Sequence, residues 1–83
     1  MTLLYFAWVR ERIGLSEEIV TAPAEVRDVA SLLAWLITRG PGYAAALDKP
    51  EAIRVAVNQV HARPGDLVGA NDEVALFPPV TGG

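Results

Sequence analysis

The sequence VRDVASLLAWLITR, residues 26–39, decides the fold more than any other stretch of the chain. Apolar residues recur in it at spacings of three and four, which places them on one face of a helix. Glu25 and Asp28 stand near its start, where the helix dipole favours negative charge. Gly40 is a good C-terminal stop, and Pro41 prevents continuation. The apolar face of this predicted helix comprises Val26, Val29, Leu33, Leu36 and Ile37.

Two strands are predicted before this helix. Residues 2–9 (TLLYFAWV) form an almost unbroken apolar run, which is typical of a strand buried in mid-sheet. Residues 18–21 (EIVT) indicate a second strand, which Pro23 ends. Residues 10–14 between them are polar and end in glycine, which predicts a turn or a single helical turn. The two strands therefore make a hairpin.

Three further strands are predicted after the helix. A short helical turn at residues 43–47 precedes a half-buried strand at 53–57, where apolar and other side chains alternate. A short return strand follows at residues 60–62, and the last strand covers residues 73–77. The order indicates an α+β fold of two layers, with a small mixed sheet of about five strands on one main helix. We expect the last strand to lie beside the first, in parallel, at the centre.

Composition excludes several classes of function. The 83 residues make one domain, and the absence of cysteine excludes disulfides and thiolate chemistry. His61 is the only histidine, so a zinc site is not expected. The formal charge is −3, with scattered basic residues, so nucleic acid is not an expected partner. We see no signal-peptide pattern and no apolar stretch of membrane-spanning length, and we expect a cytoplasmic protein.

The chain ends in the sequence PPVTGG, residues 78–83. Pro78 and Pro79 cannot donate to a sheet and hold the backbone extended, so the domain spans residues 1–77 and a flexible tail follows. Gly82 and Gly83 lack side chains, can enter a narrow channel and leave the terminal carboxylate open. An ionised carboxylate is a poor electrophile, and this chain has no phosphate-binding loop, so its activation must come from a partner.

These features resemble the small subunit of molybdopterin synthase. The ending DEVALFPPVTGG, residues 72–83, is similar to the end of that family, and its final Phe-Pro-Pro-Val-x-Gly-Gly is the specific part. Residues 5–14 resemble the family's first strand and turn, and Val57-Asn58-Gln59 its central strand end. The resemblance covers nearly the whole chain and implies the ubiquitin-like β-grasp fold.

The resemblance also implies a reaction cycle centred on Gly83. A ubiquitin-activating-like adenylyltransferase would use ATP to adenylate the Gly83 carboxylate, and a sulfur source would convert the adenylate to a thiocarboxylate. The loaded tail would then enter the large synthase subunit and give its sulfur to cyclic pyranopterin monophosphate. Two such donations build the dithiolene that later holds molybdenum. The chain itself would bind no cofactor and carry no catalytic groups of its own.

The same resemblance implies residues that bind the two partners. Phe6 and Phe77 are candidates for an exposed apolar patch, although core packing is the other interpretation of a strand phenylalanine. Arg10 is a candidate anchor for a partner carboxylate or a solvated turn residue. Pro78, Pro79, Val80 and Thr81 would bind inside the partner's channel, and two large subunits would join two small ones in a heterotetramer. His61 stands where relatives tend to have an apolar residue near the interface.

Other functions stay open at this stage. A sulfur carrier for thiamine or another pathway would share the fold and the tail chemistry, but such carriers tend to be shorter and to lack Phe-Pro-Pro. A β-grasp interaction module would have an inert tail, and a protein-conjugating modifier would form an isopeptide bond. An independent enzyme is the weakest hypothesis, since the sequence contains no visible nucleophile–base pair or metal set.

Overall fold

The computed structural model describes residues 1–79. Its central element is a five-stranded mixed sheet. Its strands are β1 (Thr2–Tyr5), β2 (Glu17–Ile19), β3 (Arg54–Val57), β4 (Val60–Ala62) and β5 (Glu73–Phe77), in the spatial order β2-β1-β5-β3-β4. β1 and β5 are parallel, and the other pairs are antiparallel. The predicted parallel pairing of the first and last strands is thus confirmed.

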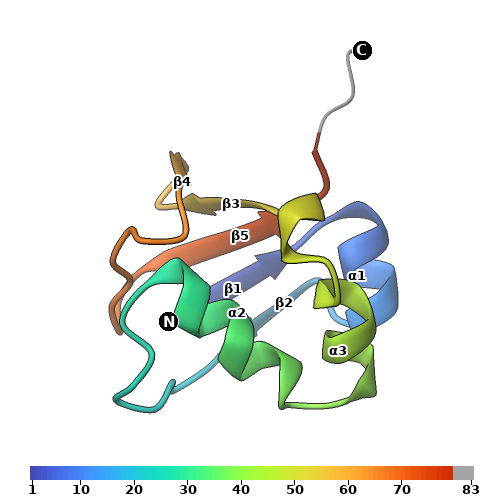
Figure 1. Ribbon diagram of the computed structural model, residues 1–83, viewed down its shortest axis with the longest axis horizontal. Coiled ribbons are helices and arrows are strands. Elements are labelled where there is room, and N and C mark those ends of the chain that lie inside the picture. Colours follow the sequence, from blue (N-terminus) through green and yellow to red (C-terminus); the bar gives the residue numbers. More distant parts are fainter. Residues whose placement is uncertain (80–83) are drawn as a thin grey trace.

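Three α-helices lie on one side of this sheet or at its end (Figure 1). They are α1 (Ala7–Ile13), α2 (Val29–Ile37) and α3 (Pro41–Leu47), and a 3₁₀ helix, η1 (Pro50–Ala52), precedes β3. α2 crosses the face of the sheet, as predicted for the main helix, while α1 and α3 pack against each other beside it. None of the helices in residues 1–79 is long and apolar enough to cross a membrane.

The first predicted strand, residues 2–9, is wrong in its second half. The Phe6 amide donates to the Leu76 carbonyl oxygen at 3.1 Å, and pairing with β5 stops there. The amides of Val9 and Arg10 then donate back to the Phe6 carbonyl and start α1, so residues 10–14 are the end of a helix, not a turn of their own. The sequence does not show where the strand changes to a helix, because β1 and α1 both contribute apolar residues to the core. Val9 of α1, for example, is fully buried.

The main helix begins later than predicted because Asp28 caps it. The Asp28 carboxylate accepts from the Ser31 amide at 2.8 Å, and the Ser31 hydroxyl oxygen accepts from the Asp28 amide at 3.0 Å. This reciprocal capping box satisfies amides that have no partner within the helix, so residues 26–28 stay outside it. Leu32, which the sequence analysis did not place on the apolar face, is fully buried.

The main helix ends at Ile37, before the predicted stop at Gly40, and the Gly40-Pro41-Gly42 segment instead starts α3. Pro41 occupies the first turn of the helix, where its missing amide hydrogen costs nothing. A Cβ on Gly42 would lie 2.6 Å from the Arg12 carbonyl oxygen, so only glycine allows α3 to approach α1 this closely. The predicted turn at residues 43–47 is therefore the second part of a complete helix.

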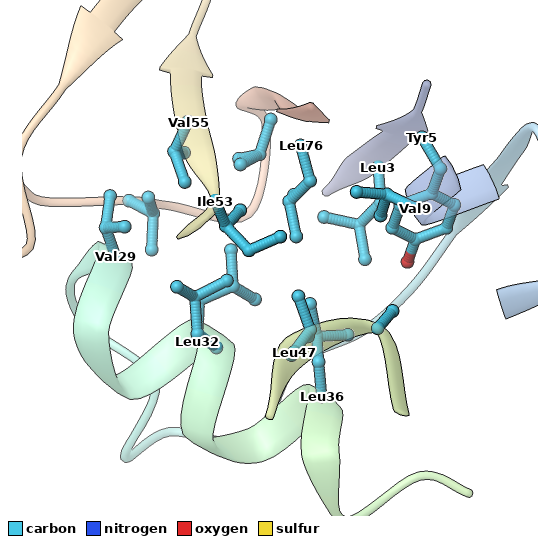
Figure 2. Packing of buried hydrophobic residues seen from close by; sticks show 14 of the residues in the cluster. Leu3, Tyr5, Val9, Val29, Leu32, Leu36, Leu47, Ile53, Val55 and Leu76 are labelled. Atoms are coloured by element: carbon cyan, nitrogen blue, oxygen red, sulfur yellow. The ribbon is translucent and has the colours of Figure 1, made fainter. Parts of the chain in front are cut away.

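The core lies between the sheet and the helices (Figure 2). Leu3 of β1 and Leu76 of β5 project from the sheet toward Leu32 and Leu36 of α2, and all four are fully buried. Leu47 brings α3 into the same cluster. Each such leucine contributes about 1.5–3 kcal/mol by leaving water, so this cluster fixes the position of the central strand β5.

Candidate functional site

The strand that leads to the C-terminal tail is the most firmly held in the sheet. β5 lies between β1 and β3, and its Val74 and Leu76 are fully buried in the core. Phe77 is the last residue of the strand, and Pro78 and Pro79 follow half-buried. The predicted end of the sheet at Phe77 is confirmed, and the chain leaves it from a rigid base. Gly82 and Gly83, with Val80 and Thr81, lie outside the described residues.

Asn58 fixes the other end of β5. Its side-chain oxygen accepts from the Glu73 amide at 3.0 Å, and its side-chain nitrogen donates to the Asp72 carboxylate at 2.9 Å. Its own amide donates to the Glu73 carbonyl oxygen at 2.8 Å. The Val57-Asn58-Gln59 segment thus joins the β3–β4 turn to the start of the tail-bearing strand, which gives this motif a structural role.

The face of the sheet turned away from the helices is open. Strand alternation places Leu4, Ala75 and Ala56 next to one another across β1, β5 and β3, and all three are half-buried. Phe77 extends this face at the base of the tail, where it stands opposite Arg54. Apolar side chains without a covering layer are typical of a surface that binds another protein.

Two residues lie beside Phe77, and neither contact was predicted from the sequence. The His61 ring on β4 meets the Phe77 ring edge-on, with 5.8 Å between centroids and 65° between planes. Arg54 of β3 pairs with Phe77 in the ladder. Both residues share the face of Phe77 because β3 and β4 are adjacent antiparallel strands. The alternation around Arg54 was visible in the sequence, whereas the pairing of β3 with β5 was not.

Phe6 lies close to the same place. Tyr5, the last residue of β1, stands opposite Leu76 in the parallel pair, so Phe6 and Phe77 are the next residues along the two chain segments. Phe6 is 47% exposed, which favours the interpretation as a surface patch over core packing. Arg10 is exposed on α1, and its amide donates to the Phe6 carbonyl oxygen at 3.4 Å. We call Phe6, Arg54, His61 and Phe77 the tail-base surface.

A cluster of polar side chains lies on the helix side of the sheet. The Glu18 carboxylate accepts from the Tyr5 hydroxyl at 2.7 Å, the Tyr43 hydroxyl at 2.6 Å and the Arg39 guanidinium at 2.9 Å. Burial alone would raise the pKa of Glu18, but these hydrogen bonds outweigh it and lower that pKa. Burial, together with the Glu18 carboxylate, raises the pKa of Tyr5 and of Tyr43.

This cluster ties the fold together. Its members come from β1, β2, the residues after α2, and α3, and each of its polar groups has a hydrogen-bond partner. A perturbed pKa often marks a catalytic site, but a site also needs an unpaired group and access for a substrate. Within residues 1–79, no group of three or more histidines and carboxylates is placed to hold a metal ion.

Comparison with known proteins agrees with the fold and shows similarity over nearly the whole chain. The chain is 39% identical to the molybdopterin synthase sulfur carrier subunit of Haemophilus influenzae, with 100% of this chain and 99% of that protein covered. It is 35% identical to the protein of the same name from Homo sapiens, with 98% and 91% covered. The crystal structure of SAMP1 from Haloferax volcanii superposes with a TM-score of 0.74 at 30% identity, covering 100% of this chain and 98% of that one.

The fold is thus the ubiquitin-like β-grasp, as the resemblance implied. The ThiS family model matches residues 3–83, and the chain belongs to this family.

Proposed function

We propose that this chain is a sulfur carrier subunit of molybdopterin synthase, and that its working atoms are those of the Gly83 carboxyl group. The observation that supports this most is the match to curated carrier subunits over 98–100% of the chain, at 34–39% identity. The geometry fits the role, because Phe77, Pro78 and Pro79 start the tail from the rigid central strand.

The chemistry proceeds in two steps at Gly83. A Gly83 carboxylate oxygen attacks the α-phosphorus of ATP, so an acyl-adenylate forms and pyrophosphate leaves. A hydrosulfide-level sulfur nucleophile then attacks the acyl carbon, so a C–S bond forms and AMP leaves with the carboxylate's oxygen. The product is a thiocarboxylate, which donates its sulfur to cyclic pyranopterin monophosphate. Gly82 and Gly83 keep the approach to this carbon free of side chains.

This cycle requires two protein partners. In the proposal, a ubiquitin-activating-like adenylyltransferase supplies the ATP site, and the synthase large subunit takes up the loaded tail in a heterotetramer. Phe6, Phe77 and Arg10 contact each partner in turn, while residues 78–81 lie in the channel that leads to its active site. The chain binds no cofactor, nucleic acid or membrane, contributes no catalytic side chain and works in the cytoplasm.

The proposal is tested by reconstituted molybdopterin formation. The full chain, the large subunit, the activating enzyme, ATP and a sulfide source are combined with the pterin precursor, and the chain lacking Gly83 is the comparison. We expect product with the full chain only, while both chains melt at the same temperature. Product formed without Gly83 would contradict the proposal. A pull-down against a thiazole synthase separates the thiamine-pathway carrier from the role proposed here.

A second function has some support from the structures. The chain also resembles the crystal structure of H. volcanii small archaeal modifier protein 1, with a TM-score of 0.73 at 29% identity. A modifier would use the same adenylated glycine, but an amine of a target protein would attack the acyl carbon. Isopeptide-linked products in the cell would favour that function over sulfur transfer.

A further inference from the structure

A groove lies on the helix side of the molecule, between α2 and the strands β3 and β4. Its volume is about 570 Å³. Small side chains on the outer part of α2, Ala30 and Ala34, leave this space open beside the short strand β4. Other apolar residues of its lining include Val29, Leu33, Ile37, Ile53, Val55 and Ala62. The groove is thus large and apolar enough to take side chains of another molecule.

The strand beside the groove is an edge of the sheet. β4 is last in the strand order and pairs only with β3 within the described sheet. Its outer side therefore presents backbone amide and carbonyl groups that no other strand in residues 1–79 satisfies, and Val60 at its start is 68% exposed. Such an edge can pair with an extended peptide, whose alternate side chains then point toward the groove.

Charge at the rim indicates what kind of peptide fits. The register places Val55 opposite Ala62, so Arg54 and Arg63 are the next positions on the two chains. Both line the groove, and neither takes part in an ion pair within residues 1–79. His61 also lines it, and Glu51 is the opposing carboxylate. In a chain of net charge −3, this rim is locally positive and complements a carboxylate.

We propose that the groove binds an extended apolar segment of a partner protein that carries a carboxylate next to its apolar residues. The segment adds to the β4 edge, places alternate apolar side chains between α2 and β3, and sets its carboxylate beside Arg54 and Arg63. The required partner chemistry follows from the apolar lining and from two rim arginines that take part in no ion pair within residues 1–79. The groove shares Arg54 and His61 with the tail-base surface, but Ala34 and Arg63 belong to the groove alone.

The test is selection from a displayed library of short random peptides on the full chain, followed by titration of the enriched peptides. Enriched sequences are expected to combine alternating apolar residues with acidic ones. Arg63→Glu is expected to weaken their binding by about tenfold, the effect of about 1.4 kcal/mol. Arg27→Glu, which reverses an exposed charge away from the groove, is the matched control and is expected to bind as the parent chain does.

A second pair of variants tests the groove itself. Ala34→Glu places a carboxylate in the groove, at an exposed position of α2. Ala45→Glu places a carboxylate at an exposed position of α3 that does not line the groove. The first is expected to abolish binding and the second to leave it unchanged, with both variants folded and both loading sulfur at Gly83. Amide NMR shifts on peptide addition are expected in residues 60–62, not in β2.

Several results would overturn this inference. They are enrichment of no peptide above background, enriched peptides without acidic residues, equal losses for Arg63→Glu and Arg27→Glu, or shifts confined to β2 or the open sheet face. Because the Gly83 reaction is read out separately, failure of peptide binding leaves the sulfur-carrier proposal standing. Conversely, loss of sulfur loading in the parent chain does not affect the groove.

Discussion

The Tyr43 hydroxyl donates a hydrogen bond of 2.6 Å to the Glu18 carboxylate, which joins α3 to the edge strand β2 across 25 residues of sequence. The same carboxylate oxygen accepts from Tyr5 of β1. Glu18 therefore holds an edge strand of the sheet to the helices.

Replacing this carboxylate should cost stability. Glu18→Gln weakens three hydrogen bonds and the ion pair with Arg39, and we expect a loss of about 1–3 kcal/mol in the free energy of unfolding. Denaturant titration measures this loss, and Glu17→Gln, an exposed neighbour on the same strand, is the control. Equal stabilities of the two variants would show that the cluster contributes nothing.

The same cluster predicts a pH dependence. The fold lowers the pKa of Glu18 below its ordinary value of 4.5, so the folded state holds the carboxylate ionised more strongly than the unfolded state does. The contribution of Glu18 to stability is thus fully present above that ordinary value and is lost as the pH falls through the lower folded-state pKa. We expect the stability difference between the parent chain and Glu18→Gln to shrink on acidification; a constant difference would contradict this.

The position of Gly42 predicts that replacing this helical glycine by alanine destabilises the protein. Alanine normally stabilises a helix by about 0.8–1.0 kcal/mol over glycine. Here the added Cβ meets the backbone of Arg12 at 2.6 Å, and we expect a net loss of roughly 1–3 kcal/mol. Thermal melts of Gly42→Ala measure it, with Gly65→Ala as the control because no atom lies within 4 Å of its added Cβ. A stabilised Gly42→Ala chain would show that α1 and α3 are not in close contact.

The backbone conformation of Ala7 predicts that replacing it by glycine stabilises the protein. Its φ of 53° is left-handed, which costs an L-residue about 1–2 kcal/mol. Glycine relieves this strain but gives the unfolded chain more freedom, worth about 0.4–1 kcal/mol, so we expect Ala7→Gly to gain roughly 0.5–1 kcal/mol. Ala44→Gly within α3 should instead lose about 1 kcal/mol. Equal destabilisation of both variants would contradict the left-handed conformation of Ala7 at the start of α1.

The tail-base surface predicts a selective loss of partner binding. Phe77→Ala is expected to weaken the affinity for the synthase large subunit by about tenfold or more, since buried aromatic anchors carry much of an interface's energy. Ile19→Ala is the control, because Ile19 is 83% exposed but lies opposite Thr2, at the far end of the open face. Calorimetric titration gives both affinities, and a loss of similar size for both variants would remove the special role of Phe77.

Local patterns in the sequence predicted part of this structure well. The strands at residues 60–62 and 73–77 have the predicted bounds, because turn residues and prolines mark their ends. Residues 6–9 were misassigned, since apolar side chains fill both β1 and α1 and no polar residue marks the change. The capping box at Asp28 uses serine in place of the usual glutamate or glutamine, so the true start of α2 was not recognised.

Contacts between distant residues could not be predicted in this way. The Glu18 cluster joins residues 5, 18, 39 and 43, which come together only after the sheet and helices have packed. The contact of His61 with Phe77 likewise depends on β3 pairing with β5. For the tail, by contrast, the sequence alone indicated a function, whereas its last four residues lie outside the described structure.

The most direct measurement is the intact mass of the full chain after incubation with the activating enzyme of its own organism, ATP and a sulfide source. The account predicts a mass increase equal to the exchange of one oxygen for one sulfur, located in the C-terminal peptide and absent from a chain that lacks Gly83. An unchanged mass, or a modification elsewhere in the chain, would contradict it.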